Sequence, residues 1–237
     1  PMVYHPLKKM VGAGITDILL VSGTEHMGDF VELFGSGKDF GCRLTYRVQD
    51  EAGGIAQALG LAELFCKDAR SVVILGDNIF ADPLKNFVSL TNSRPLDAAV
   101  MIKQVPDPGR YGVAELSSGR ILSIEEKPKQ PKSDWAVAGI YSYPPDVFEV
   151  IRTLKPSGRG ELEITDLNRL YLEQRALSVE IMGRGYAWLD TGTHETLLGA
   201  SQFIATLESR QGLKVACPEE IAYRQQWINA GQLEQLA

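Results

Sequence analysis

Two aspartates follow short apolar runs, where strand-end carboxylates commonly meet a ligand. Asp77 comes after Val72 to Gly76, and Asp190 comes after Trp188 and Leu189. Ligands of open α/β sheets bind beyond the carboxyl ends of the strands. Two carboxylates brought together there would suit Mg²⁺, which takes oxygen ligands from one or two side chains and from phosphates. For either aspartate, an Asx-turn or a helix N-cap is the structural alternative.

A glycine pair joins a predicted strand to a predicted helix in the segment Gln49 to Ala58. Gly53 and Gly54 would let a ligand approach the backbone, and the new helix would offer its free N–H groups to an anion or a base edge. A plain tight turn explains the same residues equally well.

Adjacent charges end another predicted strand at Glu125-Glu126-Lys127-Pro128. Neighbouring strand positions face opposite sides, so only one glutamate can point into a cleft. A carboxylate beside a lysine could recognise sugar hydroxyls and a phosphate. The alternative is a solvated ion pair on an edge strand, which contributes little stability.

A loop from Lys155 to Asp166 places Arg159 ahead of an acidic helix start. The arginine could bind an anion. The acidic residues Glu161, Glu163 and Asp166 also suit the positive end of a helix dipole without any ligand.

The elements that must position these groups alternate in type through the first third of the chain. Helices are predicted over 3–13, 25–35 and 55–65, and strands over 17–23, 43–48 and 72–75. The strands at 17–23 and 72–75 are predicted to be buried. This alternation is typical of βαβ units in a mostly parallel sheet flanked by helices.

After Pro83 the predicted strands are closely spaced, which indicates antiparallel additions at the sheet edge. Strands are predicted over 98–105, 112–116, 121–126, 135–143 and 177–182. Helices are predicted through 90 and over 145–154, 165–174, 193–207, 218–227 and 232–236, with Thr193 as a helix cap. We expect a single domain spanning residues 1–237.

The composition excludes several classes of protein. The 237 residues are 44% hydrophobic, enough for a large core. Three cysteines without paired spacing and three histidines argue against a disulfide framework or a zinc site. A net charge of −6 with scattered lysines and arginines argues against a nucleic-acid groove. The chain has no apolar run of about 18 residues, and we expect a cytoplasmic protein.

Seven segments, taken in chain order, together resemble the sugar-phosphate nucleotidyltransferases of the glucose-1-phosphate thymidylyltransferase type. They are Tyr46–Gln49, Gly54–Ala58, Leu75–Asn78, Arg110–Val113, Glu125–Pro128, Arg159–Asp166 and Gly185–Thr193. The resemblance covers essentially the whole chain. It implies a Rossmann-like core, a homotetramer, and synthesis of dTDP-glucose and pyrophosphate from dTTP and glucose 1-phosphate, leading to dTDP-rhamnose.

The resemblance also implies the roles of individual residues. Asp77 and Asp190 would bind Mg²⁺ and, with Lys127, form the catalytic set. The implied substrate-binding residues are Gln49 and Gly54 at the thymine, Leu75 nearby, Tyr111, Gly112 and Val137 around the glucose, Glu126 and Lys127 at the sugar and its phosphate, and Arg159 at the sugar phosphate.

The implied reaction needs no protein nucleophile. A phosphate oxygen of glucose 1-phosphate attacks the α-phosphorus of dTTP in line, and pyrophosphate leaves. Catalysis of such a step consists mainly of positioning and of neutralisation by cations. The absence of a convincing Ser/His/Asp or Cys/His set from the sequence agrees with this chemistry.

The chain departs from the family pattern at both ends. Family members begin with a strand, a G-G-x-G-T-R loop that binds the triphosphate, and a lysine before a Leu-Leu-Pro run. Here Pro1 to Pro6 match the family just after that region, and the usual closing residues are missing after Ala237. We therefore expect a domain truncated at its N-terminus and also at its C-terminus. Without the central first strand, its neighbours would be exposed, and stability and activity would be impaired.

Three alternatives compete with this hypothesis. The chain could be a non-catalytic sugar-nucleotide-binding or regulatory subunit, or a nucleotidyltransferase that uses UTP. An NAD-dependent dehydrogenase is disfavoured because no G-x-G-x-x-G follows a predicted strand.

Overall fold

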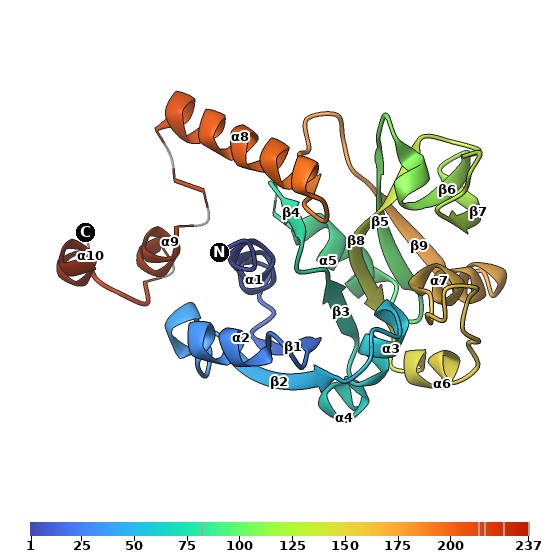
Figure 1. Cartoon of the computed structure of the whole chain (residues 1–237), viewed down its shortest axis with the longest axis horizontal. Helices are drawn as coiled ribbons and strands as arrows, with labels where there is room; N and C mark the ends of the chain where they lie inside the picture. The colour runs from blue at the N-terminus through green and yellow to red at the C-terminus, as the bar shows by residue number, and fades with distance from the viewer. Residues whose placement is uncertain (82, 213, 216, 225, 237) are drawn as a thin grey trace.

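The N-terminal third of the chain alternates helices and strands, as predicted. The computed structural model describes residues 1–81, 83–212, 214–215, 217–224 and 226–236. The first elements are α1 (Tyr4–Gly12), β1 (Asp17–Gly23), α2 (Met27–Phe34), the 3₁₀ turn η1 (Lys38–Phe40), β2 (Arg43–Gln49), α3 (Ile55–Gly60), α4 (Glu63–Cys66) and β3 (Ser71–Ile74) (Figure 1).

The helix predicted over 55–65 is divided into α3 and α4. After Gly60 the backbone closes tighter turns, in which Leu61 N donates to Ala58 O and Ala62 N to Leu59 O. Bonds of this three-residue span end a regular α-helix, and Gly60 has a low intrinsic helix propensity. The division lies at the surface of the core, where Leu59 and Ala62 remain buried.

The remaining elements begin with a short strand that the sequence did not predict, β4. They are β4 (Asn78–Phe80), α5 (Lys85–Ser93), β5 (Ala98–Gln104), the 3₁₀ turn η2 (Pro108–Arg110), β6 (Gly112–Ser117), β7 (Arg120–Glu126), β8 (Trp135–Tyr143), α6 (Val147–Ile151), α7 (Ile164–Glu173), β9 (Leu177–Ile181), β10 (Trp188–Asp190), α8 (His194–Gln211), α9 (Pro218–Arg224) and α10 (Ala230–Leu236). In the described part of the chain, no helix is long and apolar enough to cross a membrane.

The largest sheet is mixed. Its strands lie in the order β7-β6-β8-β5-β9, and β3 pairs with β8 beside this path. The mixed sheet flanked by helices and the antiparallel additions are confirmed. Parallel pairing is less prominent than predicted: β1–β2 and β5–β9 are parallel, whereas β3–β8, β5–β8, β6–β7, β6–β8 and β4–β10 are antiparallel.

Two apolar clusters cover the two faces of this sheet. Along β5, Val100 and Ile102 belong to one cluster, while Ala99 and Met101 belong to the other. Successive strand residues point to opposite faces, so a strand covered on both sides is apolar throughout. The first cluster includes residues of α3, α6 and α7, and the second includes Phe87 of α5.

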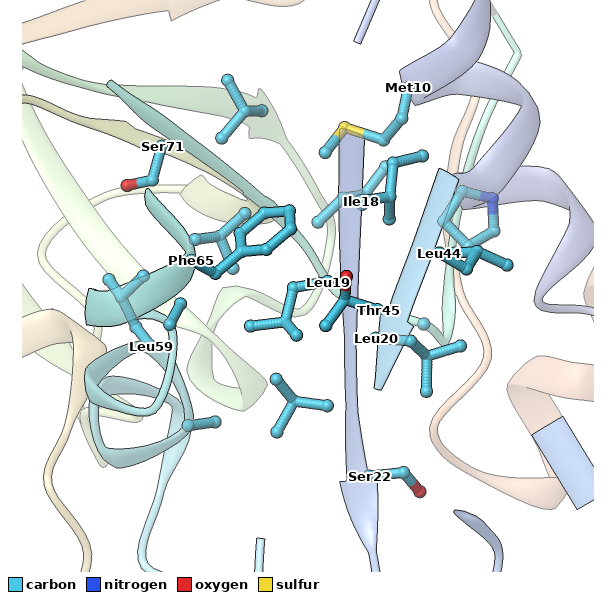
Figure 2. A pocket seen from close by; sticks show the side chains of 18 of the residues that line it. Met10, Ile18, Leu19, Leu20, Ser22, Leu44, Thr45, Leu59, Phe65 and Ser71 are labelled. Carbon is cyan, nitrogen blue, oxygen red and sulfur yellow. The ribbon is translucent and has the colours of Figure 1, made fainter. Parts of the chain in front are cut away.

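β1 and β2 form a separate parallel sheet. Among the described residues, β1 has no strand partner other than β2, and β3 has none other than β8. A cleft of about 1290 Å³, lined by both strands and by α1, α3 and α4, lies between them; we call it the β1–β3 cleft. In Figure 2, Leu19 of β1 and Phe65 of α4 point toward one another across it.

The predicted burial of β1 and β3 is wrong, although both strands form. The aliphatic residues of β1, and those that follow Ser71 in β3, are only partly buried. The cleft is the cause, because it leaves one edge of each strand without a neighbour. The buried Ser71 Oγ, which lines the cleft, has no hydrogen-bond partner among the described residues.

A short antiparallel ribbon joins two distant parts of the chain. β4 pairs with β10 so that Asn78 lies opposite Asp190 and Phe80 opposite Trp188. α8 follows β10, and its N-terminus carries the predicted cap: Thr193 accepts a hydrogen bond from Thr196 N in a capping box. The ribbon thereby places the segment after Asp190 beside the end of β3.

Candidate active site

Asp77 and Asp190 flank Gly192. A Cβ atom built on this glycine would lie 3.2 Å from Asp77 Oδ2 and 3.1 Å from Asp190 Oδ1. Gly192 N donates a hydrogen bond of 2.9 Å to Asp190 Oδ1. The structure thus brings the two predicted metal ligands together at a position where a side chain would intrude on both carboxylates.

Thr191 fastens the two aspartate-bearing segments to each other. Its backbone N and its Oγ1 both lie within hydrogen-bonding distance of Asp77 O, at 2.9 and 2.7 Å. Thr191 is buried. Two donors on one residue, both directed at the same part-buried carbonyl, hold the backbone around the carboxylate pair.

Asn78 is a buried residue to which the sequence assigned no role. Its Nδ2 donates to Asp77 Oδ1 at 2.7 Å, and its Oδ1 accepts from Trp188 Nε1 at 2.6 Å and from Gly139 N at 3.1 Å. It therefore joins β8, β10 and the Asp77 carboxylate. Its position in the motif Leu75–Asn78 was the only sequence signal.

Tyr111, which is predicted to line the glucose pocket, lies beside Asp190. Burial and the neighbouring Asp190 raise the pKa of the Tyr111 phenol above its ordinary value. Its ring contacts that of Trp188, with centroids 5.1 Å apart. A phenol that donates its hydrogen to Asp190 can still accept a hydrogen bond from a hydroxyl of a ligand.

Thr165, Glu126 and Val137 converge around Gly112. A Cβ on Gly112 would lie 3.0 Å from Thr165 Oγ1, 3.5 Å from Glu126 Oε2 and 3.7 Å from Val137 Cβ. Thr165 Oγ1 donates to Glu126 Oε2 at 2.5 Å. Neighbouring Glu125 is exposed, which confirms that only one glutamate of the pair points inward. Sequence reasoning missed Thr165, because its partner lies in a distant strand.

Two cations border Glu126. Lys127 Nζ lies 3.9 Å from Glu126 Oε1, and about half of its side chain is exposed. Arg159 NH2 lies 2.8 Å from Glu163, 3.4 Å from Glu161 and 3.7 Å from Glu126. Its hydrogen bonds with Glu163 raise the Arg159 pKa. Arg159 is thus held in place by carboxylates, and Lys127 is the more exposed of the two.

Gly54 packs against the loop that carries Arg159. Gly54 has φ +96°, and a Cβ there would lie 2.5 Å from Leu162 O. Ala56 N donates to that same carbonyl, so one N–H at the start of α3 is already bonded. Gln49 Nε2 donates to Gly54 O at 3.3 Å and to Gln57 Oε1 at 2.7 Å. The glycine is explained by backbone packing as well as by any ligand.

Tyr141 is a further residue that the sequence did not single out. It is buried, and burial together with Glu126 and Asp77 raises the pKa of its phenol. Asp77 and Glu126 therefore both act electrostatically on one buried phenol.

The β1–β3 cleft includes the residues predicted to lie at or near the thymine. Gln49, Gly54 and Leu75 line the cleft, whereas Tyr111, Gly112, Val137 and Glu126 do not. Among the described residues, no cluster of three or more His, Cys, Asp or Glu side chains could hold a metal. A cation between Asp77 and Asp190 would therefore complete its shell with water or phosphate oxygens, which is the usual coordination of Mg²⁺.

Comparisons with known proteins agree on one family. A family model described as nucleotidyl transferase matches residues 1–206. Over the whole chain, 47% of residues are identical to those of a glucose-1-phosphate thymidylyltransferase from Neisseria meningitidis, of which 83% is covered. The corresponding enzyme from Mycobacterium tuberculosis is 45% identical over the whole chain, again with 83% covered.

Solved structures share the fold. One is a protein from Bacillus anthracis, assigned as a glucose-1-phosphate thymidylyltransferase and crystallised with sucrose. It has a TM-score of 0.81 and 51% identity, over 86% of this chain and 82% of that one. A UDP-glucose pyrophosphorylase complexed with UDP-glucose has a TM-score of 0.76 at 24% identity, over 89% and 88% of the two chains. At that identity the likeness concerns the fold alone.

Proposed function

Because the chain belongs to the nucleotidyl transferase family, we infer that it is an enzyme that transfers a thymidylyl group to glucose 1-phosphate. The donor is dTTP, and the products are dTDP-glucose and pyrophosphate. One observation carries this conclusion: identity of 45–47% over the whole chain to enzymes named for this reaction. The UDP-glucose pyrophosphorylase shares much less of the sequence, so dTTP is favoured over UTP.

We propose that Asp77 and Asp190 hold Mg²⁺. Asp77 Oδ2 and Asp190 Oδ1 both lie beside Gly192, and paired carboxylate oxygens are the donors that Mg²⁺ prefers. When bound, Mg²⁺ would neutralise phosphate charge at the reacting phosphorus. Tyr111, bonded to Asp190, would help to keep that carboxylate in place.

The second group would bind the sugar phosphate. Glu126, oriented by Thr165, can accept hydrogen bonds from sugar hydroxyls, and Gly112 lets Thr165 and Glu126 approach its backbone closely. Lys127 would neutralise the attacking phosphate, and Arg159 would assist from the same side. Positioning the phosphate oxygen for in-line attack is the main contribution expected of such residues.

The thymine would lie at the third group. Gln49 presents a side-chain amide that can read a pyrimidine edge, and Gly54 and Leu75 lie near it at the end of the β1–β3 cleft. Since both donor hydrogens of Gln49 are directed at Gly54 O and Gln57, base binding would require the amide to exchange at least one of these bonds.

We further propose that the assembly is a tetramer that supplies dTDP-rhamnose synthesis. Exposed Leu197, Leu198 and Phe203 on α8 support a subunit contact. Light scattering of the purified chain measures its oligomeric state.

The reaction is tested by mixing the chain with dTTP, glucose 1-phosphate and Mg²⁺ and measuring pyrophosphate. Release is expected at a reduced rate, given the departures from the family pattern, and Asp77→Ala should lower it at least about 100-fold further if the carboxylate stabilises the transition state by roughly 3 kcal/mol. Comparing kcat/KM for dTTP and UTP tests the donor. Calorimetric binding of dTDP-glucose without any turnover would instead identify a sugar-nucleotide-binding subunit.

A further inference from the structure

We propose that Asn78 is a positioning residue, whose side-chain amide orients the Asp77 carboxylate so that Oδ2 faces Asp190 and a bound divalent cation. This inference rests on the metal site proposed above. It assigns a function to a buried amide that does not itself reach the cation.

The hydrogen-bond pattern divides the two oxygens of Asp77 between separate tasks. Oδ1 accepts the 2.7 Å bond from Asn78 Nδ2, whereas Oδ2 is the oxygen that lies near Gly192, on the side of Asp190. A carboxylate with one oxygen bonded cannot rotate without losing that bond. The other oxygen, Oδ2, is thereby directed toward the side of Asp190.

The Asn78 amide is itself held from two sides. Its Oδ1 accepts from Trp188 Nε1 at 2.6 Å and from Gly139 N at 3.1 Å. These two donors assign the carbonyl end of the amide, so that the NH₂ end must face Asp77. The side chain is only 4% exposed, and water cannot readily replace these partners.

Gly139 provides the room for this arrangement. A Cβ on Gly139 would lie 2.6 to 2.8 Å from the Oδ1, Cγ and Nδ2 atoms of Asn78, which is closer than real side chains approach. Gly139 lies in β8, the central and buried strand of the main sheet. The amide that orients Asp77 is therefore held by a buried strand.

Partners of this kind, which orient a ligand residue without touching the metal, typically change metal affinity by about 10- to 100-fold when removed. The test is Mn²⁺ binding to the purified chain, followed by electron paramagnetic resonance. Mn²⁺ prefers the same oxygen donors as Mg²⁺. Asp77→Ala should abolish binding, and Asn78→Ala should weaken it by about 10-fold or more.

Asn168→Ala is the matched control. Asn168 is also a buried amide, and its Oδ1 accepts from Tyr143 OH at 2.6 Å, within the other apolar cluster. Its loss should affect stability as the loss of Asn78 does, but should leave Mn²⁺ affinity unchanged. Circular dichroism spectra establish that each variant is folded.

If Asn78→Ala fails to fold, Gly139→Ala carries the test, because it displaces the amide while keeping both Asp77 and Asn78. Weaker Mn²⁺ binding by this variant would support the proposal. Wild-type affinity in the folded Asn78 variant, or in the Gly139 variant where that replaces it, would overturn the proposal while leaving the metal site standing. No Mn²⁺ binding by the wild-type chain would reject the metal site and this inference with it.

Discussion

β8 and β1 are both apolar strands, but they are buried very differently. Every residue of β8 after Trp135 is buried, whereas no residue of β1 is. β8 contacts β3, β5 and β6 and has a cluster on each face. β1 contacts β2 on one side and the β1–β3 cleft on the other. The apolar sequence of a strand therefore shows what it can bury, and its neighbours decide what is buried.

The sharpest test of this comparison uses two register partners. Ile140 of β8 lies opposite Ile74 of β3, and Ile140 is 0% exposed while Ile74 is partly exposed beside the cleft. Ile140→Ala should lower the free energy of unfolding by about 4 kcal/mol, because it leaves a closed cavity. Ile74→Ala should cost about half as much, because part of its surface is already exposed.

Urea denaturation of both variants measures the difference through the midpoint and the slope. Equal losses at the two positions would show that the cleft is closed in solution, and would remove the contrast between the two sides of the sheet.

A second test adds volume instead of removing it. Val100→Phe on β5 should destabilise the fold by about 2 kcal/mol, because Val100 is fully enclosed and overpacking forces neighbours to shift. Val73→Phe on β3 should cost less than about 1 kcal/mol, since Val73 lines the cleft. Thermal melting compares the two variants. A larger loss of stability in Val73→Phe than in Val100→Phe would contradict the presence of space for a larger side chain at Val73.

A third test concerns acid and the N-terminal side of the molecule. Burial, Lys8, the chain N-terminus and Lys9 lower the pKa of His5 from 6.5 to about 4. Between these values the unfolded chain binds more protons than the folded one, so stability should fall as the pH decreases from 6.5 to 4. His5→Gln should flatten that part of the stability profile.

Denaturation at several pH values between 7 and 4 measures this effect for the wild type and the variant. If the stability of His5→Gln depends on pH as that of the wild type does, groups other than His5 cause the loss of stability in acid.

The sequence predicted elements well where periodic patterns were long, and poorly where partners were remote. β5 to β8 and α7 were predicted within one or two residues of their observed ends. β4 was missed because three residues carry too little pattern to be distinguished from a loop. The burial of β1 and β3 was predicted wrongly, because hydropathy carries no information about an unpaired edge.

The candidate site shows the same limit. The proximity of Asp77 to Asp190 could be predicted, since both end apolar runs and the family resemblance covers both motifs. The bonds of Asn78 to Trp188 and of Thr165 to Glu126 could not, because each joins residues from distant parts of the chain. Which polar side chains become partners depends on the register of the strands, and a single sequence does not predict that register.

The contact between Met2 and Thr191 bears on how the protein should be handled at the bench. It places the first residues of the chain against the segment that joins the two aspartates, while α10 lies far away at the edge of the molecule (Figure 1). An affinity tag fused ahead of Pro1 would emerge beside the carboxylate pair, and a polyhistidine tag there would compete for the cation. A tag placed after α10 avoids both problems.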